Sequence, residues 1–227
     1  MQPSTHMDEI RRVSTGRSVN ASRAATTDPL SQTMQLMGAM MAYPHNTEIF
    51  GENEPADYLY KVISGSVRTY KILSDGRRQV GGFYLPGDIF GLEFSDEHTL
   101  SAEAISDAKV LVVKSSALSA LAARDPSVAQ QLFALTGREL HRVQDRILLL
   151  IKNARERVAS FLLEMAERAS ENNTIDLPMS RQDIADYLGL TIETVSRTLT
   201  SLETASAIEV SASSRRIVLR NRAALAS

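Results

Sequence analysis

The chain of 227 residues contains no cysteine. This absence excludes disulfides, thiolate zinc sites, iron–sulfur clusters and a cysteine nucleophile. No run of the sequence approaches the roughly 20 consecutive apolar residues that a membrane-spanning helix requires. The N-terminal segment also lacks the apolar stretch of a secretory signal. We therefore expect a cytoplasmic protein that does not associate with a membrane.

An excess of charge of one sign is missing too. The chain has 25 Lys and Arg residues against 27 Asp and Glu residues, which gives a formal net charge of −2. Overall charge therefore gives no indication of a nucleic-acid partner, and any basic surface has to be local. The four histidines, His6, His45, His98 and His141, have no metal-ligand spacing. We expect no metal or other cofactor.

The first part of the chain changes in composition near residue 30. Residues 1–30 are rich in Ser, Thr, Ala and Arg and predict a mobile N-terminal arm. From 31 to 122, strand-like runs end in turns at Gly65, Gly76 and Gly87, each preceded by Ser, Asp or Pro. Turns at such regular intervals predict a β-roll, or jelly roll, over this range.

After Pro126 the pattern becomes helical, and we expect one long helix over 125–152. Six of its residues alternate spacings of three and four, as in a heptad seam: Phe133, Thr136, Leu140, Val143, Ile147 and Leu150. One interpretation is a helix packed on the core of its own domain. Because the seam is narrow and flanked by polar residues, we favour a second copy of the chain as the partner. The apolar run 147–151 is also expected to contact the β-roll of its own chain.

Residues 153–227 contain two predicted helices joined by a tight turn. Ser180 is a suitable N-cap for the first helix, and Asp183 lies near the positive end of its dipole. Gly189 can adopt the left-handed conformation that ends this helix, and Thr191 can cap the next one. The stretch contains a small residue, Ala185, followed four positions later by Gly189 and six positions further on by the β-branched Val195. This spacing is typical of a helix-turn-helix.

The second of these helices carries Glu193, Ser196 and Arg197 on the face opposite its apolar residues. An exposed Glu–Arg pair at i,i+4 is one interpretation, contributing about 0.3–0.5 kcal/mol. In a helix-turn-helix, however, this helix enters the major groove, where arginine binds guanine and glutamate accepts from cytosine. We therefore expect these residues to contact DNA, together with four residues near the helix starts, Ser180, Arg181, Thr191 and Thr194.

The end of the chain reads as two short strands around a Ser-rich turn, with Arg215 and Arg216 near the tip. A plain edge hairpin is one interpretation. In a winged helix-turn-helix such a hairpin binds phosphates, which position the domain on DNA without reading sequence. The predicted fold class is α+β: a β-roll domain, a long dimerisation helix and a C-terminal winged helix-turn-helix over 153–227.

From about residue 35 onward, the sequence resembles the CRP/FNR superfamily of bacterial transcription regulators. The resemblance rests on the glycine-punctuated β-roll, the long helix and RQDIADYLGLTIETVSRTLTSLE at 181–203. Glu193, Ser196 and Arg197 match the family's E-x-x-S-R recognition triplet. The FixK-type subgroup, which activates low-oxygen, nitrogen-fixation and denitrification genes, is the most similar.

The resemblance implies a homodimeric activator that binds double-stranded DNA at a pseudo-palindrome of TTGA-type half-sites and acts with RNA polymerase. Half-sites about 10 base pairs apart, centre to centre, would suit two groove-reading helices. The FNR-type oxygen sensors hold an iron–sulfur cluster on cysteines, which this chain lacks. The resemblance therefore does not extend to direct oxygen sensing by that route.

Cyclic-AMP-binding relatives need an arginine in the β-roll to pair with the phosphate. No Lys or Arg occurs between Arg78 and Lys109, whereas five acids do: Asp88, Glu93, Asp96, Glu97 and Glu103. We expect these carboxylates to lie without a cation and to disfavour a cyclic nucleotide. The alternative is a regulator whose β-roll binds another effector, such as haem, nitric oxide or an organic ligand. An enzyme would need a metal-ligand cluster or an activated nucleophile, and the sequence contains neither.

Overall fold

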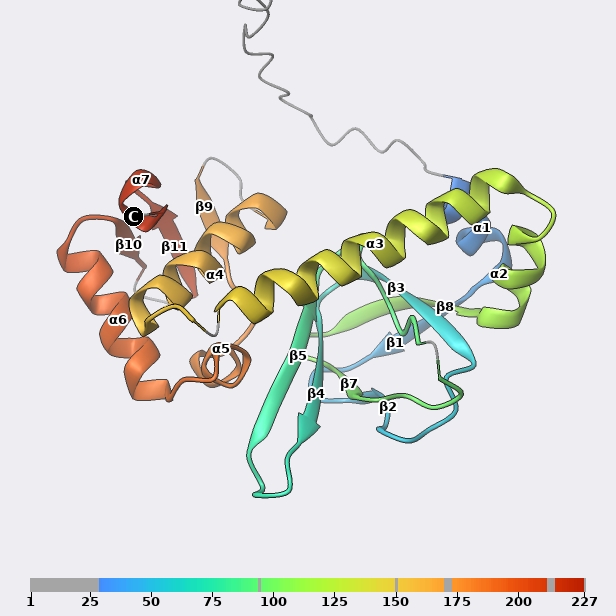
Figure 1. The fold of residues 1–227 in the computed structure, drawn as a ribbon, viewed down its shortest axis with the longest axis horizontal. Coiled ribbons are helices and arrows are strands. Elements are labelled where there is room, and N and C mark those ends of the chain that lie inside the picture. The colour runs from blue at the N-terminus through green and yellow to red at the C-terminus, as the bar shows by residue number, and fades with distance from the viewer. Residues whose placement is uncertain (1–28, 94, 150, 170–172, 212–214, 227) are drawn as a thin grey trace, which may run out of the picture.

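The computed structural model describes residues 29–226 except 94, 150, 170–172 and 212–214. Two four-stranded sheets form a β-roll, a long helix runs along it, and a second unit of helices and a small sheet follows (Figure 1). The predicted α+β class is confirmed. Among the described residues, no helix has both the length and the apolar character needed to cross a membrane.

The β-roll consists of two antiparallel sheets that face each other. One sheet has the strand order β1-β8-β3-β6 and the other β2-β7-β4-β5. The strands are β1 Ala39–Tyr43, β2 Glu48–Phe50, β3 Tyr58–Ser64, β4 Val67–Ile72, β5 Arg78–Tyr84, β6 Ile89–Phe90, β7 Ser101–Ala104 and β8 Ala108–Lys114. The predicted turn glycines Gly65, Gly76 and Gly87 all have positive φ, at 76°, 82° and 97°. Such φ values favour glycine because it has no Cβ.

Aromatic rings fill the space between the two sheets. Phe50 stacks on His98 with ring centroids 3.6 Å apart, and Phe90 contacts both Tyr60 and Tyr84 with centroids 5.1 and 5.0 Å apart. The His98 side chain is fully buried. The β-roll therefore has a packed interior.

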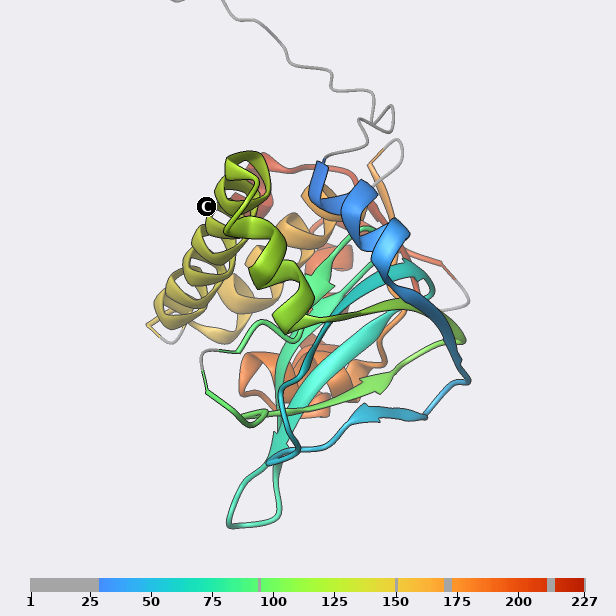
Figure 2. The same cartoon turned by 90° about the vertical axis from the view of Figure 1, so that its right-hand side faces the viewer.

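Three helices cover one end and one side of the β-roll: α1 Pro29–Met37, α2 Ser115–Ala122 and α3 Pro126–Leu149. Helix α1, which was not predicted from the sequence, lies beside α3 (Figure 2). Its Leu30 and Met34 belong to a cluster with Leu118 and Leu135. The predicted arm 1–30 lies outside the described residues except for its last two, which belong to α1.

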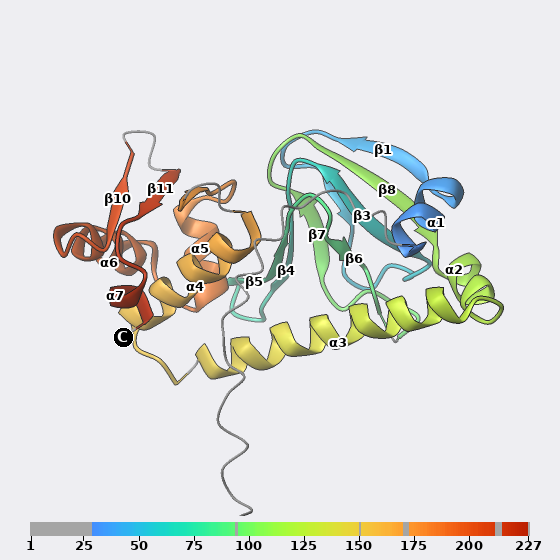
Figure 3. The ribbon, with the colours of Figure 1, turned by 90° about the horizontal axis from the view of Figure 1, so that it is seen from above.

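The C-terminal unit comprises α4 Ala154–Ala169, β9 Thr174–Asp176, α5 Arg181–Leu188, α6 Ile192–Thr204, β10 Ile208–Val210, β11 Arg216–Leu219 and α7 Ala223–Ala226. Strands β10 and β11 form the predicted hairpin, and β9 adds a third strand. Asn153 caps α4 in a capping box: its Oδ1 accepts from the Glu156 N–H at 3.0 Å, and Glu156 Oε2 accepts from the Asn153 N–H at 2.9 Å. Figure 3 shows α5 beside β4 and β5, with α3 running below both units.

Candidate nucleic-acid interface

Helix α5 begins and ends at the predicted residues, and α6 begins at the predicted one. Ser180 Oγ accepts from the Asp183 N–H at 3.1 Å, while Asp183 Oδ2 accepts from the Ser180 N–H at 3.0 Å. Gly189 ends α5 in the left-handed conformation, with φ 64° and ψ 41°. Thr191 Oγ1 accepts from the Thr194 N–H at 3.2 Å and caps α6. These caps satisfy the free backbone groups at a tight helix-turn-helix corner.

The apolar sides of the two helices pack on each other and on α4. Six apolar residues of α5 and α6 are buried: Ile184, Ala185, Leu188, Val195, Leu199 and Leu202. They share a core with Val158, Phe161, Leu162 and Met165 of α4. Because this face of α6 is fixed inward, the opposite face is exposed to solvent.

The exposed face of α6 brings the predicted recognition residues together. Glu193, Ser196 and Arg197 line one shallow surface depression with Ile192. Ile192 is 38% exposed and was missed by the sequence analysis. Its position one turn before Ser196 could have identified it. The depression thus presents an acid, a hydroxyl, a guanidinium and an apolar side chain, which are the groups that read base edges in the major groove.

Glu193 is held in its ionised form at the start of α6. Its own backbone N–H and the Thr191 hydroxyl lower the pKa of Glu193 below its ordinary value, and the positive charge of Arg197 adds to this effect. At neutral pH the Glu193 side chain is therefore a hydrogen-bond acceptor only.

The other predicted DNA contacts lie around this face in varied environments. Ser180 is exposed, but its hydroxyl also donates to Asp183 Oδ2 at 2.7 Å. The Thr191 and Thr194 hydroxyls lie 3.1 Å apart. Arg181 is half-buried, and desolvation lowers its pKa. In the hairpin, Arg215 is exposed and Arg216 binds both oxygens of Asp176 at 3.0 Å.

The predicted seam of α3 is largely open to solvent in the single chain. Phe133 is 80% exposed, Leu140 and Ile147 are each 58% exposed, and Val143 is 53% exposed. Thr136 is half-buried and donates its hydroxyl to the Leu132 carbonyl at 3.0 Å. Leu150 lies outside the described residues. The run 147–151 touches the rest of the chain through Leu149, which packs on the cluster that includes Val80 and Phe83.

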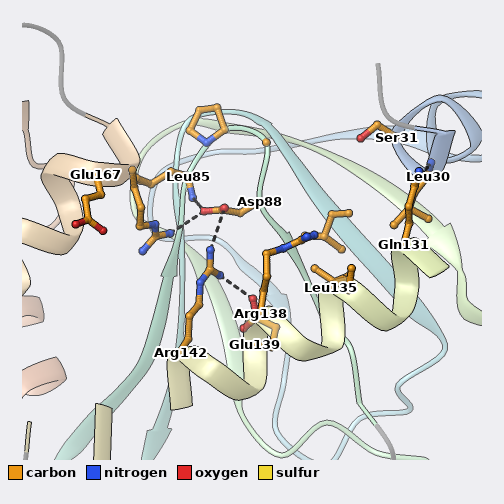
Figure 4. Close-up of a pocket in the computed structure, with 15 residues that line it drawn as sticks. Leu30, Ser31, Leu85, Asp88, Gln131, Leu135, Arg138, Glu139, Arg142 and Glu167 are labelled. Atoms are coloured by element: carbon orange, nitrogen blue, oxygen red, sulfur yellow. Dashed lines mark hydrogen bonds and ion pairs between the residues drawn. The ribbon is translucent and has the colours of Figure 1, made fainter. Parts of the chain in front are cut away.

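A cavity of about 640 Å³ lies between the β5–β6 turn and helices α1, α3 and α4 (Figure 4). At its centre, Asp88 Oδ1 lies 3.4 Å from Arg142 of α3, and Asp88 Oδ2 accepts from Arg168 of α4 at 2.7 Å. The expectation that Asp88 lies among carboxylates without a cation is therefore wrong. Arg142 and Arg168 come from helices that follow the β-roll in the sequence. The expectation is also wrong for Glu103, which accepts from Arg68 of β4 at 2.9 Å.

The fold and the exposed α6 face define the class of protein: a transcription regulator with a β-roll domain and a DNA-binding helix-turn-helix. Residues 40–125 match the cyclic nucleotide-binding domain family, and residues 156–227 match the Crp-like helix-turn-helix domain family.

Individual relatives make the assignment more specific. The chain is 49% identical over 201 residues to the nitrogen fixation regulation protein FixK of Azorhizobium caulinodans, covering 86% of this chain and 81% of that protein. It is 41% identical to the protein of the same name from Bradyrhizobium diazoefficiens, covering 77% and 76%. The solved structure of FixK2 from Bradyrhizobium japonicum superposes with a TM-score of 0.80 at 53% identity, covering 83% of this chain and 96% of that one. The chain belongs to the CRP/FNR superfamily of transcription regulators and is of the FixK type.

Proposed function

We propose that the protein is a homodimeric transcription activator that recognises a TTGA-type palindrome and needs neither a cyclic nucleotide nor an iron–sulfur cluster. The observation that carries this proposal is the capped α6 helix, whose exposed face gathers Glu193, Ser196 and Arg197. Two relatives of the chain are named nitrogen fixation regulation proteins. We extend this role to the present chain, in genes expressed at low oxygen, with RNA polymerase as the protein partner.

Each recognition residue has a distinct role in this proposal. Arg197 donates two hydrogen bonds to guanine O6 and N7, Glu193 accepts from a cytosine amino group, and Ser196 contacts a thymine edge or a phosphate. The phosphates beside α6 are bound by four residues, Ser180, Arg181, Thr191 and Thr194. The phosphates beside the hairpin are bound by Arg215 and Arg216. Phosphate contacts set the register of the protein on DNA, and the triplet reads the sequence.

The dimer is formed by the seam of α3. Its exposed apolar residues Phe133, Leu140, Val143 and Ile147 are spaced seven, three and four positions apart, as positions of a heptad repeat are in a two-stranded coiled coil. A palindromic operator requires two recognition helices related by a two-fold axis, and such a dimer supplies them.

The β-roll is a poor fit for a cyclic nucleotide, although its family is named for one. Aromatic rings occupy its interior, so a purine would have to displace packed side chains. In the adjoining cavity, the acids Asp88, Glu139 and Glu167 balance the arginines Arg138, Arg142 and Arg168, and burial raises the pKa of Glu139. A phosphate there would find no surplus of positive charge.

A second candidate keeps the DNA binding but adds an effector. The same cavity is lined by apolar residues as well, among them Leu30, Leu85 and Leu135. An organic ligand could bind there and compete with the contact between Asp88 and Arg168. A ligand that raises DNA affinity tenfold, about 1.4 kcal/mol of coupling, would favour this candidate.

The test is a titration of the purified chain, with nothing added, against a TTGA-palindrome duplex and a scrambled duplex at one fixed salt concentration. We expect tight binding to the palindrome only. Arg197→Ala should weaken that binding by about 1–3 kcal/mol and relax the preference at one base pair. Arg222→Ala, an exposed arginine beyond the hairpin, is the matched control. Equal affinity for both duplexes would rule out the proposed function.

A further inference from the structure

The helix-turn-helix unit meets the β-roll along strand β5 (Figure 3). Phe83 of β5 packs against Phe161 of α4 and Tyr187 of α5, with ring centroids 6.2 and 5.2 Å apart. Arg146 of α3 lies over the Tyr187 ring at 4.7 Å. Since the covalent connection between α3 and α4 is only a short turn, these contacts decide how the two units are oriented.

An ionic cluster, here called the arginine clamp, lies beside this aromatic contact. It consists of Arg68 of β4 and Arg78 of β5, facing Asp183 and Asp186 of α5. Arg68 Nη1 and Arg78 Nη2 each donate to Asp183 Oδ1 at 2.7 Å, and Arg78 Nε donates to Asp186 Oδ2 at 2.8 Å. Gln79 of β5 adds a hydrogen bond to the Asp186 carbonyl at 2.6 Å.

The clamp is buried at its centre. Arg68 and Asp183 are only 8% and 4% exposed, and Arg68 also donates to Glu103 of β7 at 2.9 Å. The second oxygen of Asp183 accepts from the Ser180 N–H and hydroxyl. A buried ion pair contributes little net stability, but a change of orientation would leave its charges unpaired in a low-dielectric environment. The clamp is therefore suited to fix an angle between the two units.

Asp183 connects this contact directly to the recognition helix. The same carboxylate completes the capping box at the start of α5, and α5 packs on α6 through Ile184 and Leu188. The orientation of α5 on the β-roll therefore sets the direction in which α6 points. In a dimer joined through α3, it also sets the distance between the two α6 helices.

The opposite side of the interface has an independent anchor. Arg168, near the end of α4, donates to the Phe83 carbonyl at 2.6 Å and to Asp88 at 2.7 Å. Arg78 thus holds α5 at the start of β5 through ion pairs, and Arg168 holds α4 at the end of β5 through the Phe83 carbonyl and through an ion pair with Asp88 of the following turn.

We propose that Arg68 and Arg78 are positioning residues for DNA recognition, although neither belongs to the helix-turn-helix. Through Asp183 they hold the recognition helix at the one orientation that matches the spacing of two half-sites. This inference rests on the proposed function, because it assigns the β-roll a part in reading the operator. The β-roll acts as a fixed platform for the DNA-binding unit.

The test uses the full chain and Arg78→Glu, with Arg77→Glu as the matched control. Arg77 is the neighbouring residue, its side chain is 77% exposed, and it forms an ion pair with Asp75 of the same turn. Both variants make the same change in net charge, so they share any general effect on DNA affinity. The double variant Arg78→Glu/Asp186→Arg restores an ion pair across the interface with reversed charges. Circular dichroism and sedimentation velocity check that each variant is folded and dimeric.

Binding is measured against palindromes with half-sites at the native spacing and at spacings one and two base pairs longer. Relative to Arg77→Glu, we expect Arg78→Glu to lose about tenfold or more in affinity for the native spacing and to lose the preference among spacings. The double variant should regain both. Equal affinities and equal spacing preference in Arg78→Glu and Arg77→Glu would overturn the proposal, as would a double variant that stays as weak as Arg78→Glu.

A distance measurement separates this inference from the proposed function. Because the chain has no cysteine, spin labels can be placed at Lys109→Cys in β8 and Arg222→Cys before α7 without background labelling. Labelled chains are diluted into unlabelled protein so that distances within one chain dominate. Without DNA, we expect a narrow distribution in the parent and in Arg77→Glu, and a broad one in Arg78→Glu. Equal widths in all three would refute the clamp. A narrow parent distribution without specific DNA binding would refute the proposed function alone.

Discussion

The proposed dimer seam of α3 gives the prediction whose size follows most directly from the structure. The double variant Leu140→Glu/Ile147→Glu places two acids in the middle of the seam. Both native side chains are 58% exposed in the single chain, so this is the part of their surface that a partner helix would cover. The variant should remove two of the four exposed apolar side chains that the described part of the proposed seam presents to a second copy.

The expected loss can be worked from the exposed fractions. Burying a Leu or Ile side chain completely contributes about 1.5–3 kcal/mol, so burying the remaining 58% contributes about 0.9–1.7 kcal/mol. Two residues in each of two copies then contribute about 3.5–7 kcal/mol. The dissociation constant of the dimer should rise by roughly three to five powers of ten, and the charged side chains would add to this effect.

Sedimentation velocity over a range of protein concentrations measures the change, and circular dichroism checks that the variant stays folded. His141→Glu is the matched control, because its side chain is 75% exposed on the same helix but turned away from the seam. We expect a dimer for the control and a monomer for the double variant. A double variant that sediments like the parent would show that α3 does not form the dimer as proposed.

Two further predictions concern stability. Gly189→Ala should lower the unfolding free energy by about 1–2 kcal/mol, because alanine is strained in the left-handed backbone conformation of this position. The added Cβ itself has room, since it would lie 3.8 Å from Arg157. An unchanged urea midpoint would contradict this prediction. Burial lowers the pKa of His98, so below about pH 6.5 the unfolded chain binds a proton that the folded chain does not. Stability should therefore fall by at most about 1.4 kcal/mol per pH unit between pH 6.5 and 5.5. His98→Phe should remove this contribution, and an identical pH dependence in both proteins would refute it.

Local patterns in the sequence were sufficient for the helix-turn-helix. Its caps depend on residues three or four positions apart, such as Ser180 with Asp183 and Thr191 with Thr194. The turns at Gly65, Gly76 and Gly87 were predictable for the same reason, since positive φ selects glycine whatever surrounds it. Helix α1 was missed because it spans residue 30, where the predicted arm ends and the predicted β-roll begins, and its buried side chains become apparent only against α2 and α3.

The sequence by itself therefore determined the fold class, the exposed face of α6 that carries Glu193, Ser196 and Arg197, and the apolar seam of α3, because each depends on residues that are neighbours along the chain. The tertiary structure alone decided where charges from distant elements meet. Asp88 pairs with Arg142 and Arg168, which follow it by more than 50 positions, and Asp183 pairs with Arg68, which precedes it by 115. The periodicity of the sequence carries no information about such ion pairs, because the packing of whole units against each other determines which charged residues meet.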